Sequence, residues 1–407
     1  MRRSRCILLT LFLLLSFCAR GESDERREMS AEAFVAERAH QMAQEVMIVD
    51  THIDLPYRLT TKKMEDISRR TDLGEFDYPR AKAGGLDAAF MAVYVPAEYQ
   101  EKGGAKEVAD GLIDLVESLE NKWPDKFSIA RSSSELQANF EKGLFSLPMG
   151  IENGAAIEDE LGNLEYFYER GVRYITLVHG TSNQLCDSSY DSNRKWKGLS
   201  PLGRETVVEM NRLGIMVDVS HVSDESFYDV IEVSKAPVIA SHSSCRYFTP
   251  GWERNMDDRM IRLLAENGGI IQINFGSMFL TQDYREAGKR VEEFLDEKGI
   301  EWDSPEATEL IAEFRERVPA PEVTVSDVAD HIDHVVALAG IDHVGLGSDF
   351  DGVGGELPVG LEDVSCYPNL ILELLKRDYT AEDIRKICSA NLVRVWTEVE
   401  KKAIELN

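Results

Sequence analysis

Short apolar runs rich in β-branched residues recur along the chain, and amphipathic stretches of helical length separate most of them. Each run is shorter than ten residues and too apolar for a strand that exposes one face, which is typical of parallel strands buried on both sides. The eight runs cover residues 48–54, 88–95, 145–152, 174–179, 215–221, 238–242, 270–275 and 344–350. The alternation predicts an α/β fold built on a parallel sheet.

The intervening segments carry helix start and stop signals, with Asp or Ser at several starts and a glycine after several ends. They include residues 106–121, 161–170, 201–213, 224–233, 257–266 and 326–339. Eight strands alternating with helices predict a single-domain (β/α)8 TIM barrel. An open doubly wound sheet is the alternative, but no glycine-rich phosphate loop follows the first strand.

Two segments, 96–144 and 277–325, are longer than a barrel requires and are predicted to be helical insertions. In the second, the pattern predicts helices at 292–298 and 305–317. Residues 381–404 are expected to form one long amphipathic helix that closes the domain.

The N-terminus has the pattern of an export signal. Arg2, Arg3 and Arg5 precede an apolar run at 7–17 that is too short to span a membrane, and a polar stretch follows at once. Cleavage after Gly21 would leave residues 22–407 as the mature domain, in the periplasm, outside the cell or attached to the envelope. The alternative is a lipoprotein signal that ends before Cys18 and supplies an N-terminal lipid anchor, although the bulky Phe17 fits that motif poorly.

The mature chain is strongly acidic. Residues 1–21 contain four arginines and no acidic residue, which leaves 41 of the 45 basic residues against 73 acidic ones and a formal charge of −32. This balance argues against nucleic acid or anionic lipid as a partner. The four remaining cysteines are widely spaced, so disulfides are compatible with export but no pairing is selected: Cys186, Cys245, Cys366 and Cys388.

Polar side chains stand at the C-terminal ends of the predicted strands, where barrel enzymes carry their active groups. A single histidine that closes an apolar strand is more often a hydrogen-bonded core residue, but seven such residues at one edge indicate a site. They are His52, Asp54, Glu152, His179, His221, His242 and Asp349. The other histidines are interpreted as structural or surface residues, because they lie on predicted helices or before the eighth strand: His40, His331, His334 and His343.

Carboxylates and imidazoles packed into an apolar barrel mouth are costly to bury unless a cation compensates them. His with Asp and Glu suits zinc, with manganese, cobalt or iron chemically compatible. The period of two places His52 and Asp54 on one strand face, so both can reach one metal. Glu152 can bridge two metals, and the remaining histidines can complete the second site. Two metal ions bound in this way would hold a bridging hydroxide and bind a carbonyl oxygen.

These residues resemble the membrane (renal) dipeptidase family, peptidase family M19, within the amidohydrolase superfamily. The resemblance extends from about residue 39 to residue 400. It is carried by seven segments: VDTHID at 49–54, GIENG at 150–154, RYITLVH at 173–179, DVSHVS at 218–223, SHSS at 241–244, RN at 254–255 and GSDFDG at 347–352.

The resemblance implies a metallo-dipeptidase of the membrane dipeptidase type with two zinc ions (Zn2+) per chain. His52 and Asp54 would bind one ion, and His221 and His242 the other. Glu152 would bridge the two ions and take part in catalysis.

The resemblance also implies three substrate contacts. His179 would polarise the scissile carbonyl or stabilise the oxyanion, and Arg254 would bind the substrate carboxylate. Asp349 would bind the free amino group and relay a proton to the leaving amine. The substrates implied are dipeptides, including those with a C-terminal D-residue. The resemblance also leaves open that the protein forms a homodimer.

The chain departs from the family pattern at several positions. Arg246 is a second candidate, beside Arg254, for binding the substrate carboxylate. Asp351 is expected to share a face with Asp349. Gly276 stands where a mammalian member has a pocket tyrosine. The chain ends without the hydrophobic anchor signal of the mammalian members, so any membrane link is expected at the N-terminus.

Two other functions remain open on the sequence. One is an amidohydrolase that acts on N-acyl amino acids or another small amide, with the same metal ligands. The other is a non-catalytic envelope binding protein, against which the complete ligand set argues.

Overall fold

Parallel pairing joins the eight strands of a barrel in the order β1, β2, β5, β6, β7, β8, β9, β10 in the computed structural model, which describes residues 31–300 and 305–407. A parallel bridge between Ile53 and Phe350 closes the ring, and the Asp54 amide donates to the Phe350 carbonyl over 2.9 Å. The strands are β1 Ile48–Ile53, β2 Leu86–Tyr94, β5 Met149–Glu152, β6 Val172–Thr176, β7 Met216–Asp218, β8 Ile239–Ser243, β9 Ile270–Ile273 and β10 Val344–Leu346. The predicted (β/α)8 barrel is confirmed.

Each predicted apolar run overlaps one barrel strand, but the boundaries differ. The run at 145–152 is split into β4 (Phe145–Ser146) and β5, and β4 extends the sheet beside β2 together with β3 (Phe127–Ser128). Strands β7 and β10 end earlier than expected. The chain turns just after them at His221 (φ 69°) and Asp349 (φ 64°), in a backbone region that a strand does not use.

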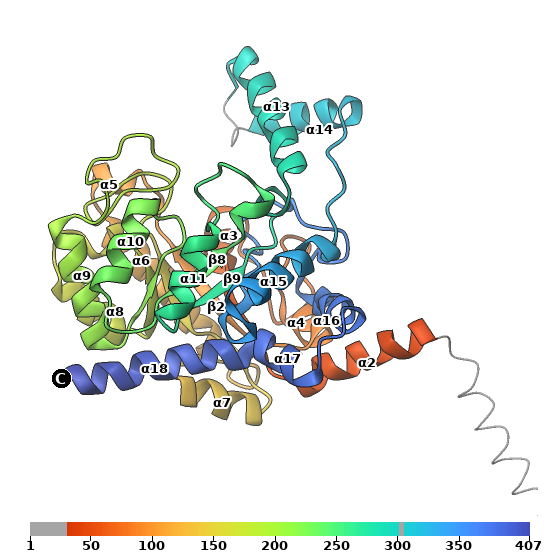
Figure 1. Ribbon diagram of the computed structural model, residues 1–407, viewed down its shortest axis with the longest axis horizontal. Coiled ribbons are helices and arrows are strands. Elements are labelled where there is room, and N and C mark those ends of the chain that lie inside the picture. The colour runs from red at the N-terminus through yellow and green to blue at the C-terminus, as the bar shows by residue number, and fades with distance from the viewer. Residues whose placement is uncertain (1–30, 301–304) are drawn as a thin grey trace, which may run out of the picture.

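Helices cover the outside of the barrel (Figure 1). Side chains of Ser200, Ser223 and Asp257 accept backbone N–H groups at helix starts, as the sequence signals predicted, and Ser132 and Thr324 do the same at α7 and α15. The barrel helices are α2 Ala31–Glu45, α3 Leu55–Thr61, α4 Tyr78–Gly84, α5 Tyr99–Lys102, α6 Ala105–Lys122, α7 Ser133–Glu141, α8 Gly162–Glu169, α9 Pro201–Leu213, α10 Asp224–Val233, α11 Asp258–Glu266, α15 Val325–Ala339 and α16 Tyr367–Lys376.

The C-terminal segment is less regular than predicted. Instead of one helix it forms α17 (Ala381–Arg385), a π-helical turn at Lys386–Ala390, and α18 (Asn391–Leu406). Helix α18 runs along one side of the barrel (Figure 1) and packs Trp396 into a buried cluster with Phe90 and Tyr174 from the strands. This helix therefore forms part of the core, as expected of a closing element.

The insertion after β9 forms α12 (Ser277–Leu280), α13 (Gln282–Lys298) and α14 (Pro305–Arg317). Helices α13 and α14 project from the barrel (Figure 1) and share a small core of their own that includes Val291, Leu295 and Ala307. The prediction of helices in this insertion is confirmed, although α13 begins ten residues before the predicted start at 292.

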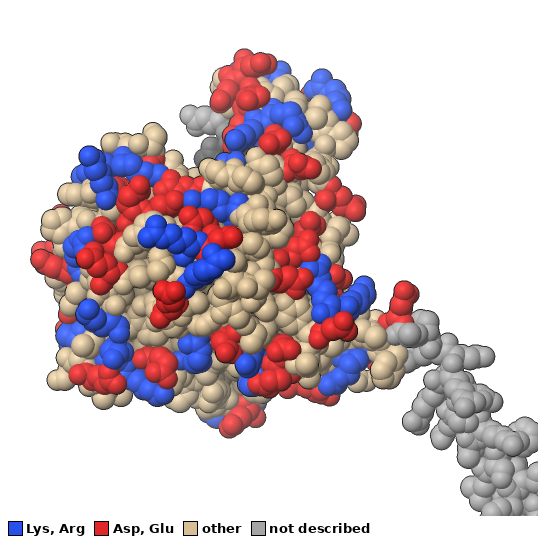
Figure 2. Space-filling model, viewed as in Figure 1, with Lys and Arg blue, Asp and Glu red and all other residues tan. Residues whose placement is uncertain are grey.

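Acidic and basic side chains are interspersed on the face shown in Figure 2. The four cysteines after residue 31 are free thiols. Within the described ranges, no helix has both the length and the hydropathy that a membrane span requires. The predicted export signal at 1–21 and the alternative lipid-attachment site at Cys18 lie outside the described residues.

Candidate metal centre

Four strands bring their C-terminal ends to one buried site. Glu152 is the last residue of β5 and is in register with Tyr94 on β2 and Thr176 on β6. His52 lies in β1 and His242 in β8, while the remaining predicted ligands follow the ends of their strands: Asp54 after β1 and His221 after β7. The barrel thus assembles residues that are up to 190 positions apart, as His52 and His242 are.

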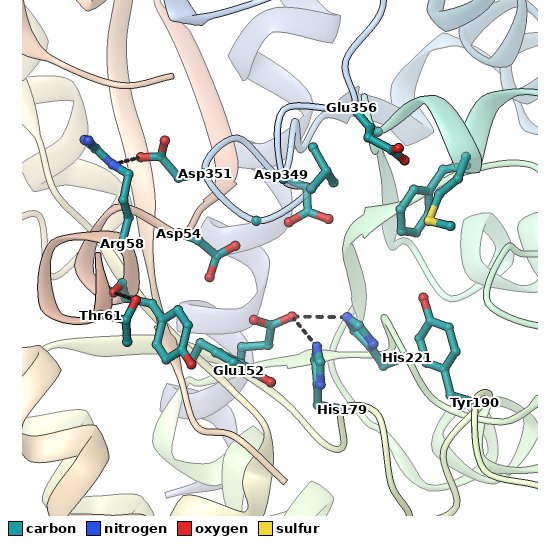
Figure 3. Close-up of a pocket in the computed structure, with 18 of the residues that line it drawn as sticks. Asp54, Arg58, Thr61, Glu152, His179, Tyr190, His221, Asp349, Asp351 and Glu356 are labelled. Carbon is teal, nitrogen blue, oxygen red and sulfur yellow. Dashed lines mark hydrogen bonds and ion pairs between the residues drawn. The ribbon is translucent and has the colours of Figure 1, made fainter. Parts of the chain in front are cut away.

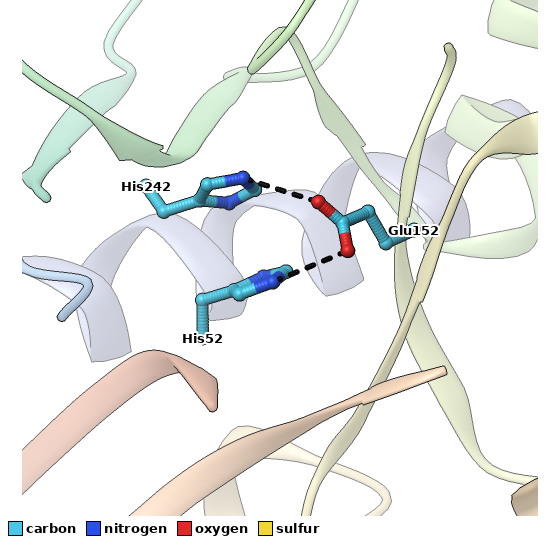
Figure 4. Close-up of side chains that lie close together, drawn as sticks. All are labelled: His52, Glu152 and His242. Atoms are coloured by element: carbon cyan, nitrogen blue, oxygen red, sulfur yellow. Dashed lines mark ion pairs between the residues drawn. The ribbon is translucent and has the colours of Figure 1, made fainter. Parts of the chain in front are cut away.

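The carboxylate of Glu152 lies between two groups of histidines. Its Oε2 lies 3.5 Å from His52 Nε2, and its Oε1 lies 3.1 Å from His221 Nε2 and 3.3 Å from His242 Nε2. Figure 4 shows the Glu152 carboxylate reaching both His52 and His242. One oxygen therefore faces each half of the predicted ligand set, as a bridging carboxylate requires.

The half around His52 contains two further carboxylates. His52 Nε2 lies 3.4 Å from Asp54 Oδ2, so these two side chains lie close enough to reach one metal ion, although Asp54 lies just beyond the end of β1. Asp349 joins His52 and Asp54 in a group whose candidate ligand atoms lie within 4.8 Å of one another. The Asn274 amide donates to Asp349 Oδ2 over 2.8 Å and fixes this carboxylate.

His179 approaches the same oxygen of Glu152 as His221 does, and not the oxygen that faces His52. Its Nε2 is 3.7 Å from Glu152 Oε1, and Figure 3 shows His179 and His221 both directed at that carboxylate. The His179 side chain keeps 25% of its surface exposed, whereas the Glu152 side chain keeps 5%. It is therefore the most accessible of these histidines and faces the pocket.

Burial and neighbouring charges shift the pKa values of the clustered side chains around Glu152. Burial raises the pKa of Asp349 to about 7, with Asp54 and Glu152 adding to the rise. Burial opposes ionisation of Glu152 as well, but His52 and His179 hold its pKa well below 4.5. The pKa of His52 is raised well above 6.5, since Tyr174 and Glu152 outweigh the lowering effect of burial. The buried carboxylates thus favour a positive charge beside His52, which a metal cation would supply.

His221 and His242 are kept neutral and ready to coordinate. Burial lowers the pKa of both rings well below 6.5, and the positive charge of Arg254 adds to this at His221. Their Nε2 atoms approach within 2.8 Å of each other beside Glu152. His52 Nε2 is buried without a hydrogen-bond partner. Converging imidazole and carboxylate donors with such an unpartnered nitrogen fit divalent metal ions, and zinc fits this donor set well.

The backbone near the site is strained at residues other than glycine. His221, Asp349 and Asn153 (φ 89°), the residue after Glu152, all have positive φ. Such conformations cost about 1–3 kcal/mol each and persist where the surrounding structure fixes them. At His221 and Asp349 this backbone conformation directs the side chains toward Glu152 and Asp54, which no strand periodicity could reveal.

Arg254 and Arg246 have different environments. The Arg246 guanidinium is paired with Asp224 through contacts of 2.7 and 2.5 Å. Arg254 is 3% exposed, forms no ion pair with a described carboxylate and has an Nε without a partner. Its Nη2 lies 3.2 Å from His221 Nε2, so the guanidinium borders the metal centre. Arg254 donates instead to the Ser243 hydroxyl and the His242 carbonyl, so of the two arginines it is the one whose charge has no carboxylate partner among the described residues.

Asp351 does not share a face with Asp349, so that expectation was wrong. Both residues lie beyond the end of β10 in a turn with positive φ, where the period of two no longer applies. Asp351 pairs with Arg58 over 2.8 Å and accepts a hydrogen bond from the Glu75 backbone amide. Asp349 instead faces Asp54 and the other candidate ligands (Figure 3). The choice of Asp349 agrees with this geometry.

A pocket of about 720 Å³ opens onto the cluster. Most of its walls could not be predicted from the sequence, because residues in loops and insertions carry no periodic signal. Tyr94 ends β2, Tyr190 lies in the long loop between β6 and α9, and Phe279 lies in α12. Glu292 and Ile311 come from the projecting helices α13 and α14, so this insertion contributes to the pocket as well.

The glycine at 276 agrees with this crowding. A Cβ there would lie 2.7 Å from a methyl of Val353 and 2.9 Å from the Phe279 ring. The backbone approaches its neighbours too closely for a larger side chain, so this position cannot hold the tyrosine of the mammalian member without rearrangement.

The model of the membrane dipeptidase family, peptidase family M19, matches residues 36–407. The chain belongs to family M19. A protein of Schizosaccharomyces pombe described as an uncharacterized dipeptidase is 32% identical over 405 residues, covering 94% of this chain and 86% of that protein.

Two solved structures are similar to this M19 member. The probable dipeptidase PvdM of Pseudomonas aeruginosa has a TM-score of 0.79 and 26% identity, covering 90% of this chain and 99% of its own. A metallopeptidase from Rhodobacter sphaeroides with a phosphinate mimic of L-Ala-D-Ala has a TM-score of 0.73 and 27% identity, covering 87% and 99%. Family and relatives support metal-dependent dipeptide hydrolysis, and the His, Asp and Glu groups suggest a binuclear metal site.

Gly352 allows Asp54 and Asp349 to approach each other. A Cβ at this position would lie 2.3 Å from an oxygen of each carboxylate. We expect Gly352→Ala to displace one of them and to weaken metal binding about tenfold or more, by analogy with changes next to metal ligands. Competition with a chromophoric chelator measures this affinity.

The matched control is Gly180→Ala, because Gly180 follows His179 and a Cβ there meets no atom within 4 Å. Equal metal affinity in the two variants would contradict the placement of Asp54 and Asp349 beside a bound ion.

Proposed function

We propose that the protein is a zinc-dependent dipeptidase with two metal ions bridged by Glu152. The observation that carries this proposal is the position of Glu152, whose two oxygens face separate ligand groups at the base of a pocket of about 720 Å³. His52 and Asp54 would hold one ion, and His221 and His242 the other. When bound, the two ions would supply the hydroxide for hydrolysis and a Lewis-acid contact to the scissile carbonyl.

Three residues of the chain would orient the substrate around this centre. Arg254, buried without a carboxylate partner, would bind the C-terminal carboxylate. His179, which faces the pocket, would donate to the carbonyl oxygen as charge develops on it. Asp349, which lines the pocket and accepts from the Asn274 side-chain amide, would bind the free amino group and pass a proton to the leaving amine.

Fixing both ends of the substrate explains a preference for dipeptides over longer peptides, because a third residue would have to displace one of the two terminal contacts. The relative with the L-Ala-D-Ala mimic supports a tolerance for a D-residue at the C-terminal position. We extend the proposal to the cellular setting: residues 1–21 act as an export signal, and the catalytic domain works outside the cytoplasm.

The proposal is tested by purifying the mature chain, counting its bound metals and assaying L,L- and L,D-dipeptides, tripeptides and N-acyl amino acids with and without chelator. We expect two zinc ions per chain and dipeptide cleavage that falls to background in chelator and returns with zinc. Cleavage of N-acyl amino acids alone would favour the alternative amidohydrolase. Absence of hydrolysis by zinc-loaded protein would contradict the proposal.

The role of Arg254 is tested by Arg254→Met. Loss of one partner from a buried charged contact costs about 3 kcal/mol, so kcat/KM for dipeptides should fall about a hundredfold or more. Dipeptide amides, which lack the carboxylate, should lose little.

Arg246→Met is the comparison, since Asp224 already engages that guanidinium. A larger loss of dipeptide cleavage in Arg246→Met than in Arg254→Met, with both proteins folded, would reverse the assignment.

A further inference from the structure

The second ring nitrogen of each metal-site histidine has a different environment. His242 Nδ1 contacts the Ser241 hydroxyl over 2.7 Å, and that hydroxyl donates to Asp218 over 2.6 Å. His221 Nδ1 is buried without a hydrogen-bond partner. His52 Nδ1 lies 2.8 Å from the hydroxyl of Tyr174, a residue inside the barrel that the reaction itself does not use.

Tyr174 is held firmly in place. Its ring is fully buried and packs against Phe90 with centroids 5.3 Å apart, and Phe90 in turn packs 5.3 Å from Trp396 of α18. A Cβ at residue 150 would lie 2.0 Å from Cζ of Tyr174, so the phenol occupies space that only Gly150 leaves free. The packed rings of Trp396, Phe90 and Tyr174 therefore fix the position of the Tyr174 hydroxyl next to His52.

The position of this hydroxyl determines what His52 can offer a metal. A neutral imidazole carries one proton, and the partner of one ring nitrogen selects the tautomer. If Nδ1–H donates to the phenol oxygen, the lone pair of Nε2 is free. That nitrogen lies 3.4 Å from Asp54 Oδ2 and 3.5 Å from Glu152 Oε2 and has no hydrogen-bond partner.

We propose that Tyr174 is a positioning residue that holds His52 in the Nδ1-protonated tautomer and presents Nε2 to the metal ion shared with Asp54. The inference rests on the proposed two-metal function. It assigns a role to Gly150, whose missing side chain admits the phenol, and links the C-terminal helix to the metal centre through packed rings.

The test is metal binding by Tyr174→Phe, which keeps the ring and removes the hydroxyl. Changes next to metal ligands weaken binding about 10–100-fold, so we expect one of the two zinc binding constants to fall by that factor and the other to stay close to the wild-type value. The visible absorption of the Co2+-loaded protein should change in the same variant. The Tm of the metal-free protein should change no more than in the control.

Tyr166→Phe is the control, because its hydroxyl donates to Asp110 over 2.8 Å on the outer helices. A purely structural role for Tyr174 would lower the metal-free Tm while leaving both zinc constants and the Co2+ spectrum as in the wild type, and this result would overturn the inference.

Failure of the proposed function is a separate outcome, because the binding constants do not depend on any substrate. It would be seen as a lack of dipeptide cleavage by the wild-type protein.

Discussion

The structure depends on one electrostatic constraint, the burial of Glu152 among four histidines and beside two further carboxylates. Glu152 is 4% exposed, yet ionised groups are rarely buried unless a partner compensates them. Here the histidines on either side hold its pKa low, while burial together with Asp54 and Glu152 raises the pKa of Asp349. Positive charge is needed between these groups, and divalent metal ions are well suited to supply it.

In the barrel, the apolar residues that stabilise the fold and the polar residues of the site lie at different levels along the barrel axis. Away from the cluster, buried apolar residues of the strands pack against Leu392, Val395, Trp396 and Val399 of α18. At the C-terminal strand ends, the chain leaves the strand conformation at His221 and Asp349 and turns their side chains toward the metal centre. The conformational strain of those turns is offset by the packed strands that precede them, so a rigid apolar barrel supports a polar, strained mouth.

Much of this arrangement could be predicted from the sequence, because its signals are local and periodic. Buried parallel strands give continuous apolar runs, and the residues that end them meet at one edge, which placed His52, Glu152 and His242 together. The relation of Asp349 to Asp351 could not be predicted, because both residues lie in a turn where alternation fails. The division of the 145–152 run, the π-turn before α18 and the pocket wall from α13 and α14 also depend on tertiary packing that no periodicity encodes.

The central claim is that Glu152 bridges two metal ions, each with its own pair of protein ligands. Anomalous diffraction at the zinc edge from crystals of the zinc-loaded protein tests it most directly. The account predicts two anomalous peaks, one contacted by His52, Asp54 and Glu152, and the other by His221, His242 and Glu152. A single peak, or a second peak that Glu152 does not contact, would contradict it.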